Sequence, residues 1–313
     1  MFQSQRQIAP SISRRSVIVG LVLGGAISVF AGCKDNAKHS VGNNPGSGSG
    51  GKKKNSGTFD PVKKNEKDGA DMVFIPAGEF MMGSSQSEID ALVKQYNNDS
   101  FKDEGPQHKV KLDGYYIYRT PVTVAQYMKF CNATGHAKPA APDFNSNWSK
   151  LDHPIANITC DDALAYCEWA GVKLPTEAQW EKAARGTDGR IYPWGNNFDR
   201  SKLWSSVGKD GDAGGTKSVG SFPSGASPFG VLDMEGNVCE FCREWYHKDF
   251  YSSQLATERN PENQPAIWNQ EFRMLRGGAW YFRDPNFFRS AGRSPVVPDV
   301  FDFSIGFRCV SEL

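Results

Sequence analysis

The chain has 313 residues, a formal net charge of +1 and an aromatic content of 12%. Its 36 basic and 35 acidic residues nearly cancel, so it lacks the net basic charge typical of nucleic-acid-binding proteins. We therefore expect no nucleic-acid partner. The chain is long enough to bury one substantial core, and the aromatic content supports one.

The first 33 residues have the composition of an export signal. An arginine pair precedes an apolar stretch over residues 17–31, which is shorter than the roughly 20 residues of a membrane-spanning helix. Residues 13–18, Ser-Arg-Arg-Ser-Val-Ile, resemble a twin-arginine signal, and residues 30–33, Phe-Ala-Gly-Cys, resemble a lipobox. We expect a lipoprotein anchored in the membrane through a lipid on Cys33. An ordinary cleaved signal and a membrane span are the alternatives.

Residues 34–71 are rich in glycine, serine and lysine and contain few apolar side chains. Such a segment cannot bury enough surface to order itself, so we expect a disordered tether. A flexible chain of this length reaches on the order of 35 Å. Because Lys34 rather than an aspartate follows Cys33, we expect the protein to be exported to the outer membrane and exposed at the cell surface.

Three helices are predicted in the remaining domain, residues 72–313. Apolar side chains recur at helical spacing over residues 122–133 and 159–170. A third helix is predicted over residues 176–185, where Thr176 and Gln179 have the spacing of a capping box. Short pieces rich in glycine, proline and aromatic residues make up the rest and predict short strands joined by irregular loops. The expected class is α+β with much coil.

Six short blocks occur in order along the domain: Met72–Ser84, Arg119–Thr123, Lys173–Gly186, Tyr192–Asn196, Glu235–Val238, and Arg276–Trp280 continued by Gly306–Cys309. Together they resemble the domain of the formylglycine-generating enzymes, or sulfatase-modifying factors. The resemblance implies a C-type lectin-like fold of formylglycine-generating-enzyme type, with short strands, few helices and much irregular coil.

The sequence departs from the family at the positions that carry its best-known chemistry, the copper-dependent oxidation. Its oxidase members bind copper with two cysteines, whose positions fall here on about Phe282 and Phe287. A phenyl ring offers no thiolate to a metal, so we expect no copper and no catalytic cofactor. The five histidines also lack the pairing of the family's iron enzymes. An enzyme of different chemistry, like the periplasmic member that matures a siderophore chromophore, is the alternative.

Six of the seven cysteines lie outside the signal. Cys167 and Cys309 match positions that are disulfide-bonded in the family's enzymes, which implies the same bond here. The pairing of Cys131, Cys160, Cys239 and Cys242 stays open. Although Cys239 and Cys242 have the spacing of a redox dithiol, their place in a packed block favours structural disulfides.

A structural calcium ion is also implied by the resemblance. The matching ligands are Asp233, Gly236, Val238 and Glu240, whose oxygens suit calcium. A solvated acidic turn without a metal is the alternative.

The segment from residue 276 to 308 lacks the alternation of polar and apolar residues expected of a core strand. Its frame, Arg276-Gly-Gly-Ala-Trp280 at one end and Ile305-Gly-Phe-Arg308 at the other, resembles the variable region of target proteins of diversity-generating retroelements. In those proteins asparagine codons are rewritten at adenines. Lysine and glutamate, which such changes do not reach, are absent from residues 280–304.

This second resemblance implies a binding site made of variable side chains, in which aromatic residues bury large areas with few rotatable bonds. We therefore expect a surface-displayed, non-catalytic ligand-binding lipoprotein whose ligand is a protein or glycan on another cell or surface. The expected ligand-binding residues are Tyr281, Phe282, Arg283, Asp284, Phe287, Gly292, Ser294, Val296, Val297, Val300, Phe301, Asp302, Phe303 and Ser304.

Overall fold

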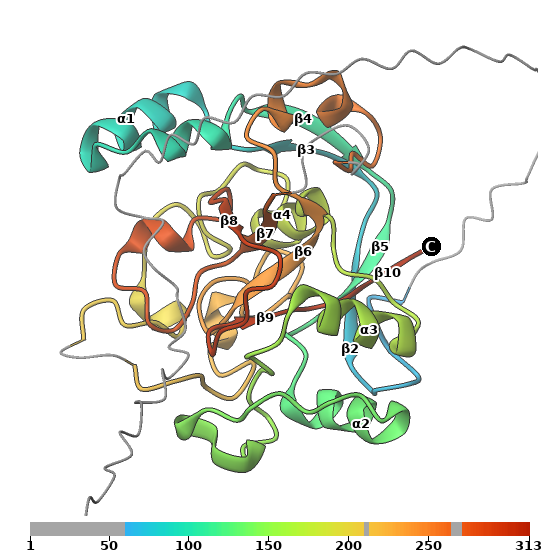
Figure 1. The fold of residues 1–313 in the computed structure, drawn as a ribbon. Helices are drawn as coiled ribbons and strands as arrows, with labels where there is room; N and C mark the ends of the chain where they lie inside the picture. The colour runs from blue at the N-terminus through green and yellow to red at the C-terminus, as the bar shows by residue number, and fades with distance from the viewer. Residues whose placement is uncertain (1–59, 210–212, 264–270) are drawn as a thin grey trace, which may run out of the picture.

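The computed structural model describes residues 60–209, 213–263 and 271–313 (Figure 1). The expected signal peptide, the lipidation site Cys33 and residues 34–59 of the expected tether lie outside these ranges. Within them, no helix combines the length and apolar character needed to cross a membrane.

The two ends of the domain meet in one antiparallel sheet with the order β1-β2-β5-β10. Its strands are β1 (Val62–Lys64), β2 (Asp71–Ile75), β5 (Tyr115–Tyr118) and β10 (Val310–Glu312). The first strand lies inside the expected tether, so the boundary at residue 72 is placed too late. Strand β1 has no apolar pattern in the sequence, and only Lys63 is partly buried. It is ordered by backbone pairing with β2, which a sequence pattern does not reveal.

Two further sheets complete the strands. One is the hairpin of β3 (Gly78–Met82) and β4 (His108–Leu112). The other has the order β8-β7-β6-β9 and consists of β8 (Ser294–Val296), β7 (Arg273–Arg276), β6 (Cys239–Trp245) and β9 (Ile305–Gly306). In this sheet β6 and β9 are parallel, and the other pairs are antiparallel.

The three predicted helices are confirmed as α2 (Val124–Thr134), α3 (Cys160–Ala170) and α4 (Glu177–Arg185). Each begins with a capping box, including the predicted one between Thr176 and Gln179. Helix α1 (Gln86–Tyr96) was not predicted, because only Ile89 and Leu92 are buried along it. Short 3₁₀ turns occur at η1 (Asp99–Glu104), η2 (Asp143–Trp148), η3 (Arg200–Lys202), η4 (Pro223–Gly225), η5 (Phe250–Ser252), η6 (Gln254–Thr257) and η7 (Pro285–Phe288).

Strand β6 separates two main parts of the hydrophobic core. Phe241 packs with α2 and α3 in one cluster, whereas its neighbour Cys242 packs with α4, β3 and β4 in the other. Successive side chains of a strand point to opposite faces, so Cys239 and Cys242, three residues apart, also point apart. They cannot form a redox dithiol in this arrangement. Both are unbonded in this structure, so the structural disulfides expected for them stay a prediction.

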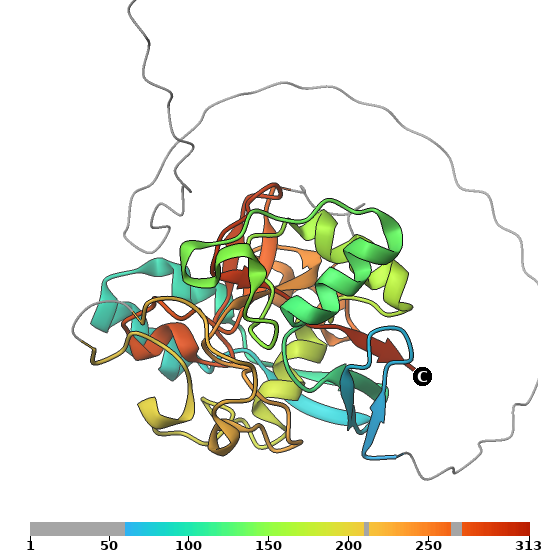
Figure 2. The same ribbon diagram turned by 90° about the horizontal axis from the view of Figure 1, so that it is seen from below.

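The ends of the described domain lie away from η7. In Figures 1 and 2, β1, β2 and the C-terminus lie on one side of the molecule, and η7 lies on the other beside α1.

Candidate functional site

Four arginines hold the segment 276–308 to the rest of the domain, and we call them the frame arginines: Arg276, Arg289, Arg293 and Arg308. Arg276, at the end of β7, donates to the backbone carbonyls of residues 290–292 over 2.8–3.1 Å. The same guanidinium forms an ion pair with Glu181 of α4, and both side chains have no exposed surface. The backbone of residues 290–292 is therefore fixed by a contact that does not involve their own side chains.

The other frame arginines also bind buried carboxylates. Arg289 pairs with Glu104 through two bonds of 2.6 Å. Arg293 binds Glu177 at 2.8 Å and 3.1 Å. Arg308 binds both oxygens of Glu240 at 2.6 Å and 2.7 Å.

All of these carboxylates come from outside the segment. The two positive charges of Arg293 and Arg276 hold the pKa of the Glu177 carboxyl below its usual range despite complete burial. The ion pairs of Glu177 thus stay charged and help to keep the backbone of the segment in place.

The two glycines after Arg276 are required by close backbone contacts. Gly278 has a φ of +70°, and a Cβ atom there would lie 2.7 Å from the carbonyl oxygen of Phe287. At Gly277, with a φ of +90°, a Cβ atom would lie 2.6 Å from the carbonyl oxygen of Met234. Any larger residue at either position would move the segment.

Most of the expected ligand-binding residues reach the surface. Four are exposed, namely Arg283, Ser294, Val297 and Phe301, and the last two each keep 51% of their accessible surface. The partly buried ones are Tyr281, Phe282, Asp284, Phe287, Gly292, Val296, Val300, Asp302 and Phe303.

Ser304 is a correction, because it is only 1% exposed and cannot contact a ligand. Its carbonyl oxygen accepts a hydrogen bond from the Cys239 N–H, and this contact holds it against β6.

A row of aromatic contacts crosses the segment. The ring centroids of Trp280 and Tyr281 are 5.6 Å apart, those of Tyr281 and Phe282 are 4.6 Å apart, and those of Phe282 and Phe287 are 5.0 Å apart. Burial raises the pKa of the Tyr281 phenol. Phe144, from outside the segment, packs on Trp280 at 5.7 Å. The row combines half-exposed rings that a ligand could touch with inner edges that pack on the core.

Phe282 and Phe287 occupy the positions matched to the copper-binding cysteines, and their rings contact each other instead. All six cysteines of the described ranges are buried elsewhere. The contact of the two rings gives this part of the surface apolar rather than metal-binding chemistry.

Helix α1 and η1 form a wall beside the segment that the sequence reasoning missed. The Tyr96 hydroxyl donates to Oδ1 of Asp284 over 3.1 Å, and Asn286 bonds the same hydroxyl. Glu104 at the end of η1 binds Arg289, as described above. The spacing of Ser85 and Glu88, which forms a capping box, was the one sequence signal that could have revealed α1.

Three of the expected calcium ligands, Asp233, Gly236 and Val238, lie in the turn before β6, and the fourth, Glu240, lies in β6 itself. Within the described ranges, no N–H or O–H group donates a hydrogen bond to the carbonyl oxygens of Gly236 and Val238 or to Oδ1 of Asp233. Burial raises the pKa of the Asp233 carboxyl to about 6. The carboxylate of Glu240 is shared with Arg308 and with the indole of Trp180, at 2.8 Å. Oxygens with unused capacity fit calcium chemistry, and Glu240 would have to serve the ion and Arg308 together.

The expected disulfide partners are adjacent but not bonded in this structure. The sulfurs of Cys167 on α3 and Cys309 next to β10 lie 3.6 Å apart in the core, beyond the roughly 2.05 Å of a disulfide. The structure brings the pair together, and the bond itself stays a prediction.

Comparison with known proteins identifies the family. Residues 58–313 match the sulfatase-modifying factor enzyme 1-like domain. The chain is 31% identical over 296 residues to the formylglycine-generating enzyme of Streptomyces coelicolor, covering 77% of this chain and 88% of that protein.

Two solved structures are similar in fold. PvdO from Pseudomonas aeruginosa has a TM-score of 0.65 at 27% identity and covers 82% of this chain and 100% of PvdO. Treponema denticola variable protein 1 has a TM-score of 0.60 at 20% identity and covers 80% and 98% of the two chains. The expected α+β, C-type lectin-like fold is confirmed, and the chain belongs to the sulfatase-modifying factor enzyme 1-like family.

Proposed function

We propose that this protein is a non-catalytic, surface-displayed lipoprotein that binds a ligand through a site diversified by a retroelement. One observation carries the proposal: the frame of the segment 276–308 is held by buried ion pairs, whereas most of the expected variable side chains reach the surface. Substitutions at those side chains can therefore change what is bound and leave the backbone in place.

The position of the domain ends supports display. The chain enters the described domain on the side away from η7. A flexible tether attached to a lipid on Cys33 would thus join the domain on the far side from η7 and leave the η7 side free to meet a ligand. We propose the outer membrane as the location and a protein or glycan on another cell or surface as the ligand.

Sequencing the gene and its surroundings tests the proposal. We expect a near-copy of the 3′ end of the gene beside a reverse transcriptase gene. The two copies should differ only at adenines, in codons of surface residues such as Val297 and Phe301, and should agree at the codons of the frame arginines. The absence of such a copy, or differences spread evenly over buried and exposed codons, would reject the diversified site.

An enzymatic function is the second candidate, favoured by the 31% identity to a formylglycine-generating enzyme. Glu235 is a titratable group whose environment is perturbed as that of many catalytic acids is. It is buried under the segment, its Oε2 has no hydrogen-bond partner, and burial raises the pKa of its carboxyl well above the usual range. Oxidation of a small-molecule or peptide substrate by the purified protein, lost in Glu235→Gln, would establish an enzyme without the copper cysteines, and we expect no such turnover.

A further inference from the structure

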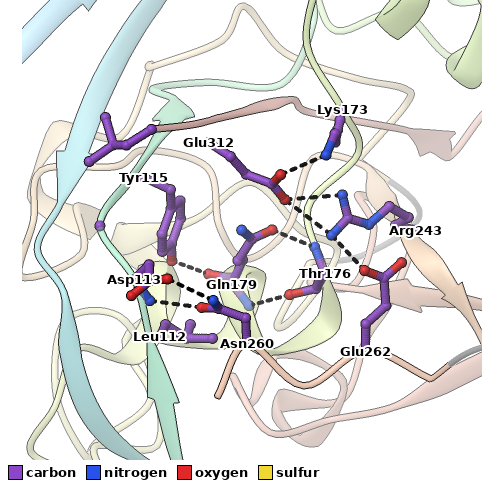
Figure 3. A pocket seen from close by; sticks show the side chains of 12 residues that line it. Leu112, Asp113, Tyr115, Lys173, Thr176, Gln179, Arg243, Asn260, Glu262 and Glu312 are labelled. Carbon is purple, nitrogen blue, oxygen red and sulfur yellow. Dashed lines mark hydrogen bonds and ion pairs between the residues drawn. The ribbon is translucent and has the colours of Figure 1, made fainter. Parts of the chain in front are cut away.

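A cleft of about 760 Å³ lies beside the first turn of α4 (Figure 3), and none of the frame arginines lines it. Its walls are the turn between β4 and β5, the first turn of α4, β6 and the C-terminal strand β10. This volume is within the range of small-molecule sites, which is roughly 300–1,000 Å³. None of the expected ligand-binding residues lines it.

Opposite charges meet at one end of the cleft. Glu312 accepts bonds from Lys173 at 2.6 Å and from Arg243 at 3.2 Å. Arg243 also binds Oε2 of Glu262 at 2.9 Å. Figure 3 shows Glu312 between the two cations, with Glu262 on the other side of Arg243. The near balance of charges disfavours a ligand with a large charge of one sign.

The cleft also holds a buried amide with an unused donor. The side chain of Gln179 is 7% exposed, and its Oε1 accepts from the Thr176 N–H at 2.8 Å to cap α4. Its Nε2 has no partner among the residues that the structure describes. This nitrogen is not one of the fully buried atoms that lack a partner, so solvent reaches it, and a ligand oxygen can take the place of water there.

Two further groups have spare capacity. The exposed Lys173 ammonium has three N–H donors, one of which binds Glu312. Oε1 of Glu262 accepts no bond from any described residue, and its side chain is 38% exposed. The cleft thus offers donors for a carboxylate, an acceptor for an ammonium group, and an apolar wall of Leu112 and Leu313.

We propose that this cleft is a second binding site, separate from the segment 276–308, for a small zwitterion of the class of α-amino acids and dipeptides. Gln179 and Lys173 bind the ligand carboxylate, Glu262 binds its ammonium group, and Leu112 and Leu313 contact its side chain. The site does not depend on the proposed function, because none of these residues lies in the diversified segment.

Calorimetry and ligand-observed NMR with the full chain test this proposal, with leucine and glycyl-leucine as probes. We expect saturable binding of at least one of them, and at least tenfold weaker binding of its N-acetylated and C-amidated forms. Gln179→Glu keeps the oxygen that caps α4 and removes the donor, so it should weaken binding at least tenfold.

Gln126→Glu is the matched control. Gln126 has the same capping role in α2, where its Oε1 accepts from the Thr123 N–H at 2.8 Å, and it does not line the cleft. This variant should bind as the wild type does. No binding of either probe, equal binding of the blocked forms, or unchanged binding by Gln179→Glu would each overturn the proposal.

Discussion

Arg289 and Glu104 form a buried bidentate ion pair across 185 residues of sequence, with both nitrogen–oxygen distances at 2.6 Å. The Ser84 hydroxyl also donates to this carboxylate at 2.7 Å. The pair ties the segment 276–308 to η1, a part of the domain that carries none of the expected variable residues. Its removal should therefore act on the frame without altering the exposed side chains.

Glu104→Ala should destabilise the fold strongly. It leaves the Arg289 charge buried without a partner, which costs about 3–5 kcal/mol. Chemical denaturation measures the free energy of unfolding. Asp99→Ala, in the same 3₁₀ turn, removes an exposed pair with Lys102 and should cost less than about 1 kcal/mol. Equal effects of the two substitutions would show that the buried pair does not hold the frame.

Polar substitutions at the exposed apolar positions should leave stability nearly unchanged. For Val297→Asn and Phe301→Asn, both at side chains that are 51% exposed, we expect changes within about 0.5 kcal/mol. Phe288→Asn is the contrast, because Phe288 is fully buried, and it should cost about 3 kcal/mol or more. A large loss at Val297 or Phe301 would mean that these side chains serve the core and not a ligand.

Stability should fall as pH rises because of Glu244. Burial, then the nearby Glu177 carboxylate, raises the pKa of the Glu244 carboxyl to about 8. The folded state therefore binds this proton more tightly than the unfolded state. The resulting stabilisation is complete below the ordinary glutamate pKa and is lost as pH rises through about 8.

Glu244→Gln removes the titration and keeps an oxygen for the Glu177 N–H, now 2.8 Å away. Relative to the wild type, the variant should gain on the order of 1–3 kcal/mol between pH 5 and pH 9. Urea denaturation across this range measures the difference. Parallel pH profiles of the two proteins would contradict the raised pKa.

A disulfide between Cys167 and Cys309 is expected in protein exported to an oxidising compartment, since their sulfurs lie in contact. The long loop that it closes stabilises by roughly 4–5 kcal/mol on chain entropy. Peptide mapping without reductant should recover the linked peptides, and reduction should lower the free energy of unfolding. If both cysteines of exported protein are recovered as free thiols, the predicted disulfide does not form.

Calcium should raise the unfolding temperature if the turn before β6 holds the ion. Asp233 supplies the carboxylate that no cationic side chain binds directly, so Asp233→Ala should abolish the shift. A chelator should lower the unfolding temperature of the wild type and leave the variant unchanged. A wild-type protein that responds neither to calcium nor to chelation would leave Arg308 as the sole cation at Glu240.

The sequence predicts the parts of the fold whose signals are local. Helices α2, α3 and α4 follow from periodicity and capping residues. Helix α1 and strand β1 were missed because each is ordered by tertiary contacts: two buried side chains in α1 and pairing with β2 for Val62–Lys64. Local patterns contain no record of such contacts.

The sequence predicts which residues form the surface of the candidate site, but not which carboxylates hold its frame arginines. Its exposed residues could be placed from the frame motifs, apart from Ser304, whose burial depends on its bond to β6. The carboxylates that hold the frame arginines come from residues 104, 177, 181 and 240. Their pairing spans long sequence separations, so a single sequence cannot reveal it.

The buried ion pairs of the frame also bear on how such a protein evolves. If the segment is diversified as proposed, new side chains at positions such as 297 and 301 would arise on a scaffold that is already folded, because the frame arginines are held from outside the segment. Selection would then act mainly on affinity, since few such variants would be lost to misfolding. The stability of the frame is in this sense a source of evolvability.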